Sequence, residues 1–271
     1  MEEAEFQAIL EHEERHWWYR GRLRIVRHQV ARLGLPPGAR ILDAGCGSGR
    51  VLDELAQYGS VTGIDASPVA VAAAEARGHD VSRARVEELP FPDGSFDLVT
   101  CLDVIEHTPD DLRALSELVR VTRPGGYLFV TVPAYQSLWS AHDERNGHQR
   151  RYRRWNLRQV AESAGWQLVR DTHFNSLLLP PAAAVRLAER KRRHEQRSEL
   201  AMTPRWLGPV LELPLRLEAA LLRRGVSLAA GLSVAALFVR PESAQRQPAE
   251  IARKRRGGVA HAPAASGSPG A

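Results

Sequence analysis

A glycine-rich turn at residues 45–49 is the first candidate for a ligand-binding element. It lies in the run Ile41-Leu42-Asp43-Ala44-Gly45-Cys46-Gly47-Ser48-Gly49, between an apolar segment and a predicted helix. Glycine adopts backbone conformations that a Cβ forbids and lets a ligand lie against the main chain. The dinucleotide pattern G-x-G-x-x-G is not met, because Arg50 stands at its third glycine position. Asp43 would repel a pyrophosphate, so the turn favours a cationic or amine-bearing ligand. The alternative, a plain strand-to-helix turn, needs only one glycine.

Asp65 is the second candidate ligand-binding residue. It ends an apolar segment 20 residues after Gly45, the offset at which an acidic side chain in such folds meets the hydroxyls of a ribose. The alternative is an ordinary helix N-cap, but Ser67 before Pro68 suits that role equally well. We therefore expect Asp65 to contact a ligand.

Three histidines are the candidates for acid–base chemistry. His107 follows a predicted strand, and His142 and His148 lie in a charged segment that ends at Tyr152. Imidazole exchanges a proton near neutral pH and serves as a general base. The alternatives are a capping or packing role for His107 and a solvated charged loop for His142 and His148. No metal site is predicted, because the two cysteines, Cys46 and Cys101, are too few for a Cys-rich zinc module and are interpreted as small core residues.

The elements around these residues predict a parallel sheet. Short apolar strands alternate with helical patterns, an order that requires crossover connections. The carboxyl ends of parallel strands meet at one edge of a sheet, so the glycine turn, Asp65 and the histidines should lie together there. The predicted strands are 40–44, 60–65, 96–102 and 126–133, with a short one at 79–83, and the predicted helices are 50–57, 68–77 and 110–121.

The flanking segments complete the predicted fold. A helical pattern over 2–33 includes Trp17-Trp18-Tyr19, and a mostly helical insertion is expected at about 176–225. A helix at 157–164 and strands at 167–174 and 232–240 would complete the sheet edge. The predicted fold class is α/β, Rossmann-like, with a mostly parallel seven-stranded sheet and helices on both faces. The predicted domains are an N-terminal helical cap (1–35), an α/β domain (36–240) and a disordered basic tail (241–271).

Four blocks of residues together resemble the class I S-adenosylmethionine-dependent methyltransferases, in the branch that includes the quinone-biosynthesis enzymes. They are Asp43 to Gly49, Gly63-Ile64-Asp65, Leu89 to Asp97, and Arg123-Pro124-Gly125-Gly126. The blocks occur in the family's order over residues 40–133. A weaker resemblance extends outward through His16-Trp17-Trp18-Tyr19-Arg20-Gly21-Arg22 and through the closing strands to about residue 240. In related enzymes an aromatic-bearing first helix closes over the cofactor, which the resemblance implies for Trp17-Trp18-Tyr19; core packing is the alternative.

The resemblance implies S-adenosylmethionine as cofactor and assigns its contacts. Asp43, with the Gly45 and Gly47 backbone, would hold the methionine end, Asp65 the ribose, and Ala66 would lie beside the adenine. Leu102 and Asp103 would lie near the methionine. The implied cofactor-binding set is Asp43, Ala44, Gly45, Cys46, Gly47, Asp65, Ala66, Val86, Glu87, Leu102 and Asp103.

One position departs from the family pattern. Arg85 stands where many relatives place an acidic residue that accepts from the adenine amino group. Either Glu87 substitutes for that residue, or the Val86 backbone alone holds the adenine.

The predicted function is methyl transfer to a small-molecule or lipid-linked acceptor, at oxygen or carbon rather than nitrogen. The methyl donor is already activated, so the protein must align the acceptor and exclude water. The alternatives are a non-catalytic binder of S-adenosylmethionine or S-adenosylhomocysteine and, less favoured, an NAD-dependent enzyme.

Composition limits the partners. The net charge of +5 includes +3 from the residues after Arg240, so a nucleic-acid partner is not predicted. No signal peptide is recognised, and the uncharged stretch Gly225–Val239 is shorter than the ~20 residues of a spanning helix. We expect a soluble cytoplasmic protein. The Leu-rich and Arg-rich insertion would either contact an anionic membrane surface or form a capping subdomain with a solvated charged face.

Overall fold

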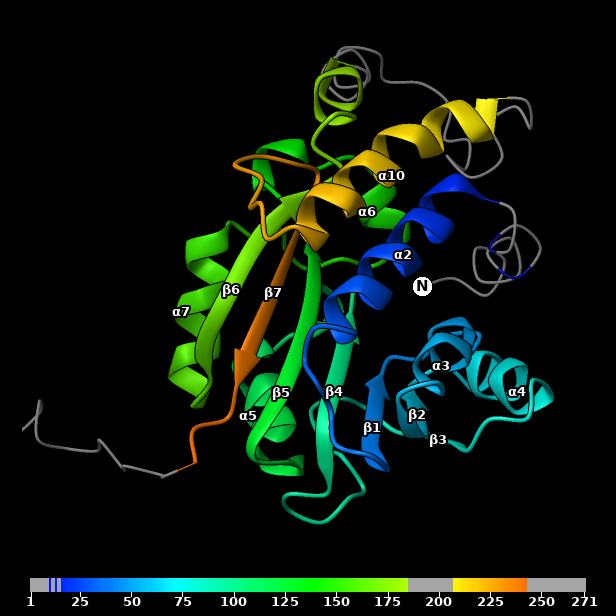
Figure 1. Cartoon of the computed structure of the whole chain (residues 1–271), viewed down its shortest axis with the longest axis vertical. Coiled ribbons are helices and arrows are strands. Elements are labelled where there is room, and N and C mark those ends of the chain that lie inside the picture. Colours follow the sequence, from blue (N-terminus) through cyan, green and yellow to red (C-terminus); the bar gives the residue numbers. More distant parts are fainter. Residues whose placement is uncertain (1–9, 11–12, 14–15, 185–206, 243–271) are drawn as a thin grey trace, which may run out of the picture. The chain divides into compact units, whose positions relative to one another are not determined.

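A seven-stranded sheet with the order β3-β2-β1-β4-β5-β7-β6 forms the centre of the described residues up to 241 (Figure 1). The computed structural model describes residues 10, 13, 16–184 and 207–242 of the chain. β7 runs antiparallel to both of its neighbours, and every other pairing is parallel. This confirms the predicted Rossmann-like α/β fold with a mostly parallel sheet. The strands are β1 (Ala39–Ala44), β2 (Gly59–Asp65), β3 (Val81–Arg83), β4 (Phe96–Leu102), β5 (Thr122–Pro133), β6 (Gln167–Phe174) and β7 (Ser233–Val239).

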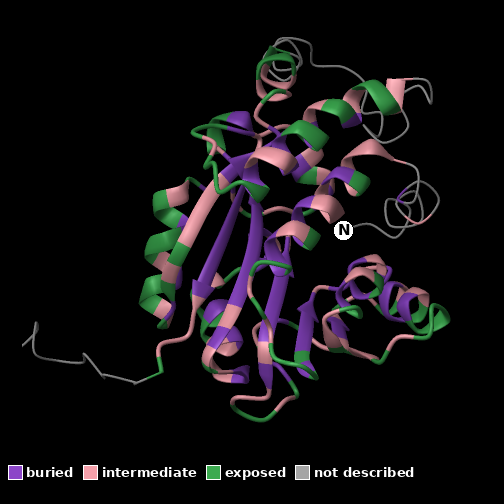
Figure 2. Cartoon of the chain, in the orientation of Figure 1, coloured by how far each residue is buried: buried purple, intermediate pink, exposed green. Residues whose placement is uncertain are grey.

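Helices cover both faces of the sheet. One face packs against α5 and α7, and the other packs against α2, α10 and part of α3. The central strands are buried between these two layers, as Figure 2 shows in purple. Strands covered on both faces read as continuous apolar runs, which is why their positions were predictable. The helices are α2 (Trp17–Val30), α3 (Arg50–Leu55), α4 (Pro68–Ala76), α5 (Asp111–Val121), α6 (Ala141–Arg145), α7 (Arg154–Ala164) and α10 (Gly208–Arg223).

Helix α5 shows how the sequence specifies its local structure. Asp110 caps the helix by accepting a hydrogen bond from the Arg113 backbone N–H. The buried side chains on α5 recur at a spacing of three or four residues, so they form a single stripe toward the sheet. They are Ala114, Leu115, Leu118 and Val121. This helix fixes one face of the sheet below the residues of the candidate site.

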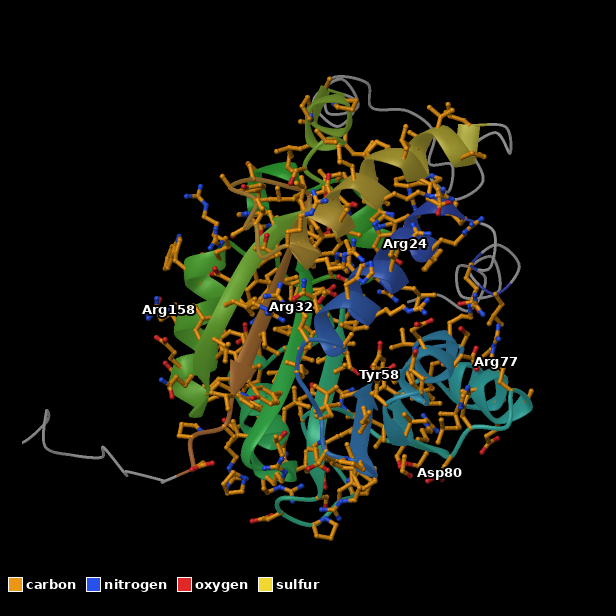
Figure 3. All side chains as sticks on the ribbon, in the orientation of Figure 1. Arg24, Arg32, Tyr58, Arg77, Asp80 and Arg158 are labelled. Carbon is orange, nitrogen blue, oxygen red and sulfur yellow. The ribbon has the colours of Figure 1, made fainter. Side chains whose placement is uncertain are left out.

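Helices α2 and α10 come from opposite ends of the described chain and pack side by side (Figure 1). A Cβ at Gly21 would overlap the side chain of Leu215, so glycine is needed for their close approach. Buried Glu212 on α10 accepts a hydrogen bond from Arg24 on α2 at 3.1 Å and lies 3.5 Å from Arg20. Figure 3 labels Arg24 on α2. The two helices form one layer on a face of the sheet.

Several boundaries differ from the predicted ones. β5 begins at Thr122 rather than 126, because Thr122 pairs with Phe96 before a shift in register. The segment 140–152, predicted as a loop, contains α6, whose N-terminus carries a capping box of Ser140 and Asp143. α10 continues through Pro214, which interrupts a helical pattern in sequence but is tolerated in this packed helix.

Parts of the predicted organisation lie outside the described residues. They are most of the helical pattern before residue 16, the centre of the insertion (185–206) and the tail after residue 242. The domain boundaries drawn from the sequence stay a prediction. Among the described residues, every helix is too short or too polar to cross a lipid bilayer.

Candidate active site

A cavity of about 1060 Å³ opens at the carboxyl ends of the parallel strands. Its walls come from the segments after β1, β2, β4 and β5, and α2 and α10 contribute to the other side. The cavity brings together every residue predicted to bind cofactor except Ala44, and all three predicted histidines. Ala44 is fully buried and packs in the core behind the cavity wall.

The glycine turn forms one wall of this cavity. Gly45, Gly47 and Gly49 all have positive φ, at 91°, 56° and 84°, a region that side chains with a Cβ rarely adopt. A Cβ at Gly45 would overlap Val104, whereas a Cβ at Gly47 would meet no atom within 4 Å. Gly47 also lines the cavity, so a side chain there would take up ligand space. The turn is therefore a backbone cradle as well as a connection.

Asp65 holds the glycine turn while facing the cavity. Its carboxylate accepts hydrogen bonds from the Gly47 N–H at 3.0 Å and from the Ser67 N–H at 2.8 Å. Ser67 caps α4 by accepting from Ala70, as the sequence predicted. Two backbone N–H groups thus occupy part of the hydrogen-bonding capacity of the Asp65 carboxylate. A ligand would use the acceptor capacity that remains.

Asp43 is a buried carboxylate with one unsatisfied oxygen. Its Oδ1 accepts a hydrogen bond from the Thr100 hydroxyl at 2.6 Å, and its Oδ2 has no partner among the described residues. Burial raises the pKa of Asp43 from 3.8 to about 6. An unpaired buried carboxylate is costly, so this oxygen favours a cation or a hydrogen-bond donor in the adjoining space.

Arg22 and Asp103 join α2 to the end of β4. Arg22 Nη1 donates to Asp103 Oδ2 at 2.6 Å, and the guanidinium lies 5.0 Å from the centroid of Trp18 and 5.9 Å from that of Tyr19. Asp103 has a positive φ of 57°, which turns the chain away from the sheet at the point where the cavity begins. All four residues line the cavity.

The far end of the cavity contains the segment that departs from the family pattern. Val86 is buried there, and Ala66 lies nearby on the same wall. Arg85 is mostly exposed and donates to the carboxylate of Glu87 at 2.8 Å. One Glu87 oxygen therefore binds Arg85, so both alternatives from the sequence stay open: the other oxygen of Glu87, or the Val86 backbone.

The three histidines cluster at the opposite end. The ring centroids of His107 and His148 are 4.6 Å apart, and those of His142 and His148 are 6.2 Å apart. Nδ1 of His148 lies 2.8 Å from buried Asp143, which also forms an ion pair with Arg151. These partners hold the pKa of Asp143 well below its usual range. The pKa of His107 is lowered to about 4, mainly by burial and also by His148.

Glu106 is a cavity residue that was not predicted from the sequence. It is fully buried, and neither carboxylate oxygen has a hydrogen-bond partner among the described residues. Burial, and then the charge of Asp103, raise the pKa of Glu106 well above its ordinary value. It stands next to His107 in sequence, which is the only signal that could have pointed to it.

Comparison with known proteins gives a consistent result. Residues 42–130 match the family model described as a methyltransferase domain. A probable S-adenosylmethionine-dependent methyltransferase of Mycolicibacterium smegmatis is 34% identical over 167 residues, which cover 59% of this chain and 62% of that protein. Residues 42–130 carry a methyltransferase domain, similar to those of S-adenosylmethionine-dependent methyltransferases. This confirms the predicted family and its cofactor.

Two further similarities extend the comparison of the methyltransferase domain. The ubiquinone biosynthesis O-methyltransferase of Xanthomonas oryzae is 41% identical over 109 residues, which cover 37% of this chain and 45% of that protein. A structure of a Haloferax volcanii putative methyltransferase in complex with the Trm112 activator has a TM-score of 0.57 at 20% identity, with coverage of 88% and 95%. The structural likeness shows the shared fold. The chain spans less than two thirds of the curated relatives it matches.

The family match places only part of the cavity inside the methyltransferase domain. The glycine turn, Asp65 and the β4 end lie within residues 42–130. Arg22, His142 and His148 lie outside it. The resemblance that identified the cofactor residues was strongest over the matched residues, whereas Arg22 lies in the block His16 to Arg22, where the resemblance is weaker.

Proposed function

We propose that this protein transfers a methyl group from S-adenosylmethionine to a small-molecule or lipid-linked acceptor, at oxygen or carbon. The observation that carries the proposal is the juxtaposition in one cavity of the glycine turn and the Asp143–His148 pair. The first suits the cofactor, and the second suits an acceptor that must lose a proton. An amine that enters the site unprotonated needs no such group, which is why nitrogen is disfavoured.

The residues present fit the cofactor. The glycine backbone leaves space where a Cβ at Gly47 would intrude. The unpaired oxygen of Asp43 suits the positive charge of the methionine end. Arg22, whose Nε is also buried without a partner among the described residues, suits the methionine carboxylate. Asp65 would take the ribose hydroxyls, and Ala66, Val86 and Glu87 the adenine.

The protein's own contribution is binding, orientation and exclusion of water. When bound, S-adenosylmethionine supplies an electrophilic methyl group on a sulfonium. The start of α2 and Leu211 of α10 form part of the cavity lining, so these helices would exclude bulk water from that side. The aromatic rings of Trp18 and Tyr19 line the same space, and an aromatic face beside a cation is favourable. Leu102 and Asp103 would position the methionine end.

The acceptor is expected at the histidine end. His107, His142 and His148 line the cavity together with Glu106. This group offers several acceptors for the proton of an alcohol, a phenol or an acidic carbon. Leu178, Pro181 and Leu211 also line the cavity and would provide apolar surface for the rest of the acceptor.

A lipid-linked acceptor is supported by the outer face of α10. Val210, Leu213 and Leu217 are 59%, 65% and 53% exposed, and their spacing of three and four residues puts them on one side of the helix. Leu211 of the same helix lines the cavity. We propose that this face rests on a membrane surface in the cytoplasm when the acceptor is lipid-linked. Co-sedimentation with anionic vesicles tests this contact, with Leu213→Ser and Leu217→Ser together expected to abolish it.

Two measurements test the main proposal. Calorimetry with S-adenosylhomocysteine and with NAD distinguishes the cofactors, and we expect binding of the first alone. Transfer of a labelled methyl group to components of a metabolite and lipid extract distinguishes an enzyme from a non-catalytic binder. Binding of S-adenosylhomocysteine with no labelled product from any extract would favour the binder.

A further inference from the structure

Glu106, His107 and His148 bring three potential metal ligands together in the cavity wall. Each offers one ligand atom, and these atoms all lie within 4.8 Å of one another. His148 is separated from the other two by about 40 residues of sequence, and it reaches them because the segments after β4 and β5 meet at one edge of the sheet. The grouping is therefore a product of the fold.

The carboxylate of Glu106 is an independent indication of a ligand. Both of its oxygens are fully buried and have no hydrogen-bond donor in the described part of the chain. Buried carboxylates are normally paired with a cation or bound to a metal. Glu106 also lines the cavity, so a cation entering from the cavity can reach it.

The two imidazoles are held as metal-binding histidines usually are. Asp143 binds Nδ1 of His148 at 2.8 Å, which leaves Nε2 as the ligand nitrogen. Asp143 is in turn fixed by Arg151 at 2.7 Å, and the His107 ring hydrogen-bonds to the Asn146 backbone. Carboxylates and carbonyls in this outer position fix the ring orientation and the tautomer of ligating histidines.

We propose that Glu106, His107 and His148 bind one divalent first-row transition-metal ion. Two imidazoles and one carboxylate suit zinc, iron, cobalt or manganese better than magnesium or calcium, which prefer oxygen ligands. The centre of an equilateral triangle with a 4.8 Å edge lies about 2.8 Å from each corner, so inward shifts of less than about 1 Å give ligand distances of roughly 2.0–2.2 Å. The positions left open face the cavity.

The open positions would bind the oxygen of the acceptor. This role rests on the proposed function, whereas the metal site itself does not. A divalent ion lowers the pKa of an oxygen bound to it, so the acceptor hydroxyl would lose its proton to solvent before the transfer. In this arrangement His107 and His148 are ligands, and the ion takes over the part that a histidine base would have played.

The site is tested by metal binding to the full chain. The protein is stripped with a chelator and titrated with Co²⁺, whose visible absorption reports nitrogen and oxygen ligands. Glu106→Gln and His148→Gln each remove one ligand while keeping a similar side-chain shape. His28→Gln, on α2 and outside the cavity, is the matched control for loss of one histidine. Binding of S-adenosylhomocysteine, measured without metal, reports whether each variant keeps its fold and cofactor site.

We expect one Co²⁺ per chain, bound at least about tenfold more weakly by Glu106→Gln and by His148→Gln and unchanged in His28→Gln. Equal Co²⁺ affinity in all four proteins would overturn the metal site. If those proteins still bind S-adenosylhomocysteine, the proposed function survives that result. Conversely, Co²⁺ binding as expected with no affinity for S-adenosylhomocysteine would support the metal site and contradict the proposed function.

Discussion

Arg22 Nη1 lies 2.6 Å from Oδ2 of Asp103, so a single ion pair fastens helix α2 to the end of strand β4 across the candidate cofactor cavity. Both side chains are largely buried, at 16% and 21% exposure. Asp103 forms this ion pair from a left-handed backbone conformation, with φ at 57°. The ion pair therefore fixes the position of α2 relative to the end of β4 at the cavity.

Removal of this ion pair should weaken cofactor binding. We expect Arg22→Gln to raise the dissociation constant of S-adenosylhomocysteine by about 10- to 100-fold, because a hydrogen bond between charged groups contributes about 1.5–3 kcal/mol. The control is Arg27→Gln on the same helix, since Arg27 pairs with Glu54 while 57% exposed. Calorimetry measures the affinity of both variants for S-adenosylhomocysteine. Equal losses of affinity would mean that the effect comes from a general disturbance of α2 and not from loss of the Arg22–Asp103 ion pair.

Substitutions at Gly47 can distinguish the cost of backbone strain from the loss of space for the ligand. Gly47 and Gly78 both have positive φ, and a Cβ at either meets no atom within 4 Å. Alanine at each should cost a similar 1–2 kcal/mol of folding free energy, roughly the penalty of the left-handed region. Of these two glycines, Gly47 lines the cavity and Gly78 does not. We therefore expect cofactor affinity to fall in Gly47→Ala and to stay normal in Gly78→Ala, and Gly47→Val to abolish binding.

Asp65→Ala should weaken cofactor binding by about 1–3 kcal/mol, the cost of ribose hydroxyls left without a charged partner. The variant also loses the two backbone hydrogen bonds that hold Gly47 and Ser67, so its thermal midpoint should fall. Asp80→Ala is the matched control, because Asp80 is an acidic residue just after α4 and outside the cavity (labelled in Figure 3). A folded Asp65→Ala protein that binds S-adenosylhomocysteine normally would show that the ribose assignment is wrong.

Asp43 should make cofactor affinity depend on pH. Its pKa of about 6 means that the carboxylate is ionised at pH 8 and largely protonated at pH 5. The ionised form attracts the sulfonium, so affinity for S-adenosylmethionine should be full above about pH 7 and fall by up to tenfold per pH unit below pH 6. Asp43→Asn should bind weakly with little pH dependence. Calorimetry from pH 5 to 8 tests this, and a flat wild-type profile would contradict it.

Ionisation of Asp43 should lower the stability of the fold, although it strengthens cofactor binding. Because the folded state holds the Asp43 proton more tightly than the unfolded state, the contribution of this residue to stability falls as pH rises from 3.8 to about 6. The shift corresponds to about 3 kcal/mol. Without ligand, Asp43→Asn should therefore gain thermal stability relative to the wild type at pH 8 and gain little at pH 4, as differential scanning calorimetry would show.

The histidines should affect turnover without affecting the cofactor. We expect His148→Ala to lower the rate of methyl transfer by ~10²-fold or more, with affinity for S-adenosylhomocysteine nearly unchanged. His142→Ala should have a smaller effect, because His148 is the one anchored by Asp143. Single-turnover rates with labelled donor measure both variants. Normal rates in both would indicate that the loop is only a solvated surface.

The sequence predicted most of the sheet because buried parallel strands leave a continuous apolar signal. Strands β4 and β6 have the predicted bounds, and β1 and β2 begin one residue early. Local patterns also identified the glycine turn and Asp65. They could not identify the pairing of Arg22 with Asp103, which spans 81 positions.

Glu106 shows the other limit of sequence reasoning. A glutamate just past the end of a strand reads as a solvated side chain. Its lack of a hydrogen-bond partner becomes visible only in the structure, where the segments after β4 and β5 close around it. The Ser140-x-x-Asp143 pattern is a local signal of a helix start, although the segment was predicted to be a loop. The contacts of Asp143 with Arg151 and with His148 could not be read from the sequence. The same carboxylate that caps α6 also makes these two contacts, and a capping role alone would account for an aspartate at that position.

The contact of Gly21 with Leu215 has a consequence for synthesis of the chain on the ribosome. Of the helices that the structure describes, α2 is the first and α10 the last. Residues 42–130 can complete the glycine turn early in translation, but α2 lacks its neighbour α10 until residue 223 has emerged. A nascent chain therefore acquires its cofactor-binding turn long before it can enclose a ligand, so chains interrupted before α10 would leave the cavity open to water.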